Sequence, residues 1–206
     1  MRNLLLTSIT ILFLTTLSNA QTSMGVKGAY LLSNMAVDKD QIDENKNKSA
    51  FSVGFVSRSE GNVLFQQNEL LYARKGARYS LSNSDLEVNA NLDYLELPVS
   101  IGINLFNTPI SVYAGAYAAY LLKADYEYEN GSEEVVASYD NTDGFRRLDF
   151  GVQTGLQFKL DRLLLDARFS RGLRNVENED ILLNNQTILS NDTKNYNVQI
   201  GATLFF

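Results

Sequence analysis

The segment LDFGVQTGLQFKL, Leu148 to Leu160, alternates with a period of two residues. One phase is apolar except for a threonine and consists of Leu148, Phe150, Val152, Thr154, Leu156, Phe158 and Leu160. The other phase is polar or glycine throughout and consists of Asp149, Gly151, Gln153, Gly155, Gln157 and Lys159. Successive side chains of a β-strand point to opposite faces, so the segment predicts a long strand with one apolar and one polar face.

Two tight turns extend this pattern into hairpins. Residues 161–162 lead into a second alternating segment, and residues 106–109 join two further ones. The register predicted for these hairpins pairs Leu160 with Leu163, Gly155 with Arg168, Leu105 with Ile110 and Gly102 with Tyr113. Large polar-phase side chains thus face glycines, which suits the crowded interior of a small barrel.

The whole chain contains eight such segments. We predict strands at about 25–35, 50–57, 63–78, 92–105, 110–123, 146–160, 163–173 and 193–206, with a possible bulge within 63–78. The connections between them alternate strictly between long and short. This is typical of an antiparallel, up-and-down transmembrane β-barrel, with turns in the periplasm and long loops outside.

The first 20 residues have the features of a secretory signal. A positive start at Arg2 precedes an apolar stretch from Leu4 to Leu17, and Ser18-Asn19-Ala20 fits a cleavage site. The apolar stretch is shorter than the roughly 20 residues of a membrane-spanning helix. We therefore expect a signal peptide at 1–20 and a barrel domain at 21–206, exported to the outer membrane of a Gram-negative bacterium.

Composition excludes several classes of function. The chain has no Cys and no His, so it lacks the commonest metal ligands and the commonest general base at neutral pH. The net charge of −6 disfavours a surface that follows nucleic-acid phosphates. We expect no enzymatic activity, no cofactor, no metal site and no nucleic-acid partner.

Alternation alone does not say which face is inside, because a soluble periplasmic ligand-binding barrel is also two-faced. Strand length favours the membrane. Thirteen residues, each rising roughly 3.3 Å and tilted by about 40°, cover about 33 Å, more than an apolar band of about 25 Å. In hydrocarbon such a sheet must close on itself, so the first and last strands are expected to pair.

Several runs of residues resemble the PorT-like outer-membrane β-barrel family. They are NELLYARKGA at 68–77, LELPV at 95–99, YAGAY at 113–117, DFGVQTG at 149–155 and DARF at 166–169. The resemblance implies an outer-membrane barrel and covers almost the whole chain after residue 20. The founding member is tied to secretion of surface proteins, so an accessory role in a secretion machine stays open as an alternative.

Two groups of charged residues stand out. The inward phase carries a candidate lumen charge network of Glu96, Asp149, Lys159, Asp166 and Arg168. The long connections hold 17 of the 24 acidic residues, including an acidic extracellular loop with Asp125, Glu127, Glu129, Glu133 and Glu134. We expect the first group to fill the lumen as paired charges and the second to keep the outer surface hydrated.

The function predicted from the sequence is a structural or surface-interaction role with a packed, non-conducting lumen. An eight-stranded interior has room for its own side chains only. The expected surroundings are outer-membrane lipid and other envelope proteins, and the expected state is a monomer.

Overall fold

A computed structural model of the chain describes residues 21–36, 42–46, 48–81, 86–106, 108–130, 133–135, 147–173, 181–183, 186–189 and 194–206. The expected signal segment, residues 1–20, lies outside this part. Among the described residues no helix is long and apolar enough to cross a membrane. Eight strands form the barrel: β1 (Gln21–Ala36), β3 (Lys48–Glu60), β4 (Leu64–Leu81), β5 (Leu86–Asn104), β6 (Ile110–Asn130), β8 (Leu148–Leu160), β9 (Leu163–Gly172) and β12 (Lys194–Phe205).

The barrel is closed and antiparallel, as predicted from the sequence. Around the barrel the order is β1, β3, β4, β5, β6, β8, β9 and β12, and β12 pairs back with β1. Starting at Met24 of β1, we can go from each residue to its paired residue on the next strand, once around the barrel. This path returns to β1 at Asn34, ten residues after Met24. This stagger is what tilts the strands of a closed barrel.

The predicted hairpin registers are confirmed. Leu160 pairs with Leu163, and Gly155 pairs with Arg168. Gly102 pairs with Tyr113, and the amide of Leu105 donates to the carbonyl of Ile110 over 2.9 Å. The two-residue turn between β8 and β9 holds Asp161 at a φ of 50°, a conformation that Asp tolerates in tight hairpins.

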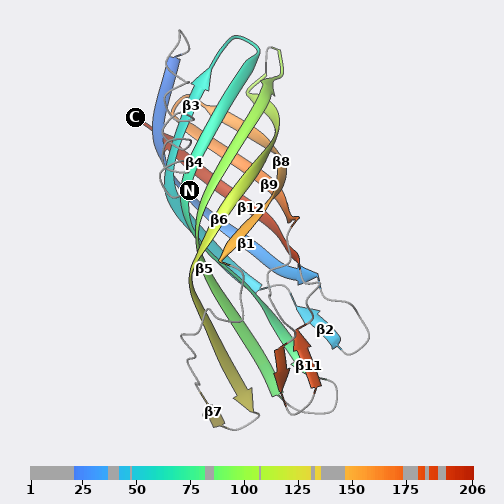
Figure 1. Cartoon of the computed structure of the whole chain (residues 1–206). Helices are drawn as coiled ribbons and strands as arrows, with labels where there is room; N and C mark the ends of the chain where they lie inside the picture. The colour runs from blue at the N-terminus through green and yellow to red at the C-terminus, as the bar shows by residue number, and fades with distance from the viewer. Residues whose placement is uncertain are drawn as a thin grey trace, which may run out of the picture.

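At the end of the long connections, three strands are longer than predicted. β4 continues to Leu81, β5 starts at Leu86 and β6 continues to Asn130 (Figure 1). Four short strands also lie in these connections: β2 (Ile42–Lys46), β7 (Glu133–Val135), β10 (Ile181–Leu183) and β11 (Gln186–Leu189). Beyond a membrane both faces of a strand meet water, so the apolar phase ends while backbone pairing continues.

The bulge proposed for residues 63–78 is wrong. The pairing of β4 with β3 and with β5 has no register shift, whereas β5 and β6 shift between Asp93 and Tyr94. The sequence suggested a bulge because polar residues occupy both phases of β4. In the structure Gln67, Glu69 and Lys75 are buried, and Arg74, on the opposite face, pairs with Asp93.

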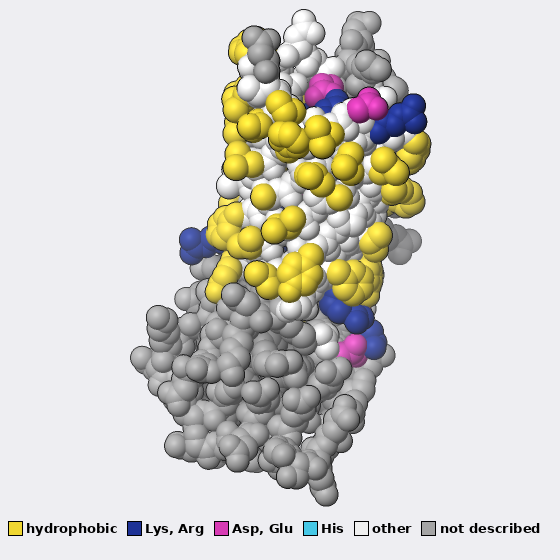
Figure 2. Space-filling view, turned by 180° about the vertical axis from the view of Figure 1, so that it is seen from behind, with side chains coloured by type: hydrophobic (Ala, Val, Ile, Leu, Met, Phe, Trp, Pro, Cys, Tyr) yellow, Lys and Arg dark blue, Asp and Glu magenta, His cyan; other side chains and the backbone are white. Residues whose placement is uncertain are grey.

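The outer wall of the barrel is apolar. Every barrel strand exposes large apolar side chains, among them Val26, Phe55, Leu70, Ile101, Val112, Leu156, Leu165 and Ile200. On the face that Figure 2 shows, hydrophobic side chains form a band with charged side chains at both borders. The face assignment made from the sequence is therefore correct: the apolar phase points outward and the polar phase points into the barrel.

Candidate functional site

The barrel interior is lined by buried charged side chains. Four cations, Lys27, Arg58, Lys75 and Arg168, and four carboxylates, Glu69, Glu96, Asp149 and Asp166, are each at most 5% exposed. Period-two alternation brings them inside, because each occupies the inward phase of its strand. Their formal charges cancel, so this part of the lumen is neutral overall.

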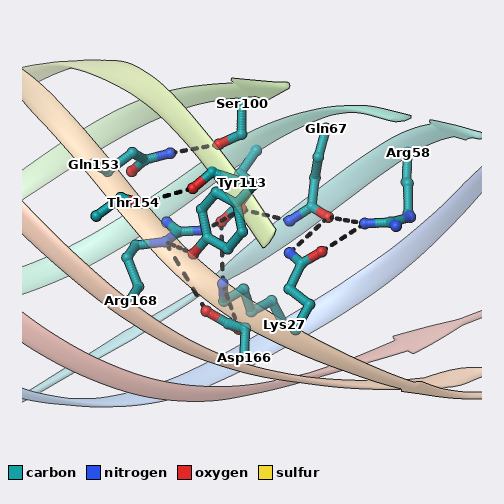
Figure 3. A network of polar contacts seen from close by, with 11 residues as sticks. Lys27, Arg58, Gln67, Ser100, Tyr113, Gln153, Thr154, Asp166 and Arg168 are labelled. Atoms are coloured by element: carbon teal, nitrogen blue, oxygen red, sulfur yellow. Dashed lines mark hydrogen bonds and ion pairs between the residues drawn. The ribbon is translucent and has the colours of Figure 1, made fainter. Parts of the chain in front are cut away.

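The central cluster is built around Glu69 of β4. Lys27 Nζ of β1 lies 3.3 Å from Glu69 Oε2 and 2.8 Å from Asp166 Oδ1. Arg168 of β9 donates to Glu69 Oε1, and its Nε donates to the Tyr113 hydroxyl over 2.9 Å. Figure 3 shows Asp166 and Arg168, both of β9, converging with Lys27 of β1 and Tyr113 of β6. Charges in a buried interior are stabilised when they are paired, and each charge of this cluster has an ion-pair partner.

A second cluster, around Arg58 of β3, lies nearer the tight turns. Arg58 Nη1 donates to Gln157 Oε1 over 2.7 Å and to Gln67 Oε1 over 3.0 Å. The guanidinium lies 3.5 Å from the centroid of the Phe65 ring, within the range of a cation–π contact. Gln67 in turn donates to Glu69 over 2.7 Å, so hydrogen bonds connect this cluster to the central one.

A third cluster lies nearer the long connections. Lys75 forms an ion pair with Glu96, and its Nζ lies 4.7 Å from the centroid of the Tyr117 ring. The Tyr117 hydroxyl donates to Asp149 Oδ2 over 3.3 Å. The ring of Tyr117 covers Gly151, where an added Cβ would lie 2.6 Å from ring atom Cε1. Glycine at this position makes room for the aromatic side chain.

Two contacts between buried side chains cross the full width of the lumen. β3 and β8 are four places apart in an eight-strand ring, as are β4 and β9, so each pair lies on opposite walls. Arg58 on β3 donates to Gln157 on β8, and Arg168 on β9 donates to Glu69 on β4. The side chains of opposite walls therefore meet, and two such bridges lie at different heights along the barrel.

The structure distributes the five residues of the expected lumen network over three places. Asp166 and Arg168 lie in the central cluster, and Glu96 and Asp149 lie in the cluster nearer the long connections. Lys159 lies at the rim near the tight turns, where its side chain is 33% exposed and pairs with Glu60. The network expected from the sequence did not include Lys27, Arg58, Glu69, Lys75 or the glutamines Gln67 and Gln157. Their inward phase was readable on β1 and β3, but the mixed phases of β4 concealed Glu69 and Lys75.

The acidic group expected in an extracellular loop lies on strands. Asp125, Glu127 and Glu129 belong to β6, while Glu133 and Glu134 belong to β7. Asp125 Oδ2 accepts a hydrogen bond from Lys123 over 2.8 Å. The other four side chains lie outside the described residues. Among described residues no group of three or more acidic side chains is arranged to hold a metal ion.

The comparisons with known proteins agree with this architecture. A family model described as "Outer membrane protein beta-barrel domain" matches residues 19–178. The chain belongs to this family. Its place is therefore the outer membrane of a Gram-negative bacterium, and the soluble periplasmic barrel considered as an alternative is excluded. No curated protein matches the chain.

Two solved structures of outer-membrane proteins are among those that match the chain. Neisserial surface protein A (NspA) is 13% identical with a TM-score of 0.51, over 90% of this chain and 99% of that chain. The outer membrane protein OprG from Pseudomonas aeruginosa is 12% identical with a TM-score of 0.46, over 91% of this chain and 96% of that chain. At this level of identity the likeness to NspA shows the fold alone.

Proposed function

We propose that this protein is a non-conducting, non-enzymatic outer-membrane barrel with a structural or surface-interaction role. The observation that carries the proposal is the pair of contacts between opposite walls, Arg58 with Gln157 and Arg168 with Glu69. Each contact occupies the centre of the lumen at its own height. An eight-stranded barrel has little interior beyond its own side chains, so these contacts leave no continuous path for water or ions.

Purified protein in planar lipid bilayers should give no steady single-channel current. Each ion pair in the lumen has no net charge, so an applied potential exerts little net force that would displace it. A porin reconstituted at the same protein-to-lipid ratio provides the control that the assay detects conduction. Regular current steps from this protein, in proportion to the amount of folded barrel, would contradict the packed lumen.

The non-enzymatic part of the proposal is supported by the residues available. The chain has no His or Cys for general base or nucleophile roles at neutral pH. The buried carboxylates Glu69, Glu96 and Asp166 each form an ion pair with a cation, so their role is structural and not catalytic. An assay of purified barrel for release of fatty acids or peptides from labelled envelope extracts tests this part.

We propose a place in the PorT-like branch, supported by the runs 68–77, 95–99, 113–117, 149–155 and 166–169. We propose a monomer, because every barrel strand exposes apolar side chains that lipid can cover. We also propose cleavage after Ala20. Co-purification with envelope proteins tests the PorT-like branch. The mass of the protein in detergent tests the monomer, and N-terminal sequencing of the exported protein tests the cleavage site.

A further inference from the structure

Arg171 of β9 is an exposed cation on an otherwise apolar part of the outer wall. Its register partners are Val152 on β8 and Tyr196 on β12. The neighbouring outward side chains are apolar and 45% to 56% exposed: Phe150, Val152, Phe169, Leu173 and Val198. Arg171 therefore lies within the surface that faces lipid.

The depth of Arg171 places it near the border of the membrane on the side of the long connections. It lies eight residues beyond Leu163, the first residue of β9 after the tight turn. At roughly 3.3 Å per residue and a tilt of about 40°, this is about 20 Å along the barrel axis, in an apolar band about 25 Å tall. The long, flexible side chain of an arginine at this depth can extend its guanidinium to the headgroup layer.

Among the side chains that the structure describes, the other basic ones at this border have protein partners. Arg74 forms two hydrogen bonds with Asp93, of 2.7 and 2.9 Å. Lys123 pairs with Asp125, and Arg147 donates to the Tyr120 hydroxyl. Arg171 forms no hydrogen bond or ion pair within the described part of the chain. A charge in an apolar surface is costly unless it is compensated, and the described part of the chain supplies no compensating group.

We propose that Arg171, together with the adjacent Tyr196, binds the phosphate group of a lipid in the outer leaflet. A guanidinium can hold two phosphate oxygens at once, and a phenol hydroxyl is a suitable third donor at the membrane interface. The apolar side chains around Arg171 contact the acyl chains of the same lipid. The net charge of −6 opposes general attraction of anionic lipids, so a preference for phosphate here is expected to depend on Arg171 itself.

The absence of tryptophan from the chain allows a local test. Val152→Trp places a single fluorophore at the register partner of Arg171. Phe51→Trp places one at the register partner of Arg74, whose charge is already paired with Asp93. The two replaced side chains are equally accessible, at 46% and 45% exposure. Quenching by brominated phosphatidic acid is compared with quenching by brominated diacylglycerol of the same chains, both in phosphatidylcholine vesicles.

We expect phosphatidic acid to quench the tryptophan at 152 with about fivefold higher affinity than diacylglycerol. Arg171→Gln should abolish the preference, and Arg171→Lys should retain most of it. The tryptophan at 51 should show a much smaller preference for phosphatidic acid, both with Arg and with Gln at position 171. Folding of each variant is established first by heat-modifiable gel mobility.

Three results would overturn the proposal. One is the absence of a preference at 152, and another is a preference there that survives Arg171→Gln. The third is an equal preference at 51 and 152, which would mean that the barrel attracts anionic lipid without a specific site. Excess inorganic phosphate should leave the quenching unchanged, since the acyl chains hold the lipid in place. Displacement by inorganic phosphate would reassign the site to a free anion.

Discussion

Glu69→Gln should lower the free energy of unfolding by about 3 to 5 kcal/mol. Glu69 and Asp166 both lie within ion-pair distance of Lys27 and Arg168, and the side chain of Glu69 is fully buried. A neutral amide of the same shape leaves two buried cations to share Asp166. The measurement is a urea titration of the barrel in lipid vesicles, with the folded fraction read from heat-modifiable mobility on gels.

Glu60→Gln is the matched control. Glu60 also pairs with two cations, Arg58 and Lys159, but its side chain lies at the rim and is 25% exposed. Water can replace the lost charge there, so the expected cost is at most about 1 kcal/mol. Adding Lys27→Met to Glu69→Gln should restore part of the stability, since it removes one uncompensated charge. Equal costs for Glu60→Gln and Glu69→Gln would show that the lumen is hydrated rather than packed.

The fold was predictable because a membrane barrel imposes a simple rule on its strands. The segment Leu148 to Leu160 alternates without interruption, since one face meets only lipid and the other only the lumen. The turn at Asp161 and Arg162 then fixes the register of the next strand. Where the environment of a strand is uniform over its length, sequence periodicity therefore defines strand, face and register together.

The extent of the strands was less predictable. β6 continues to Asn130 and β5 begins at Leu86, although the alternation of apolar and polar residues ends earlier. Outside the membrane the pairing of β5 with β6 depends on backbone hydrogen bonds, which leave no pattern of hydrophobic residues. The same reason explains why the short strands β2, β7, β10 and β11 were missed.

The partners within the lumen were beyond the reach of the sequence. Periodicity shows that Arg58 and Gln157 both point inward, but 99 residues separate them in the chain. Their contact depends on the closure of the barrel and on its stagger of ten residues, which together decide which strands face each other and at what height. The alternation along a single strand shows which side chains point inward. It does not show which residues of other strands those side chains contact.

Ile200→Arg should cost about 2 to 4 kcal/mol, because it places a charge near the middle of the apolar band. Ile200 lies midway along β12 and is 67% exposed on the outer wall. Its register partners are Tyr30 and Ala167, and neither offers a negative charge. The measurement is the same urea titration in vesicles, so that lipid covers the outer wall while stability is read.

Leu163→Arg is the control that makes this result specific for lipid. Leu163 is the first residue of β9, next to the tight turn, and is 36% exposed. A charge near the interface reaches the headgroups, so the expected cost is about 0 to 1 kcal/mol. A cost that grows with depth is the signature of a hydrocarbon slab. If water surrounded the barrel, both substitutions would have almost no effect on stability. If a protein partner covered the outer wall, both would be costly. Either outcome would contradict a barrel surrounded by lipid.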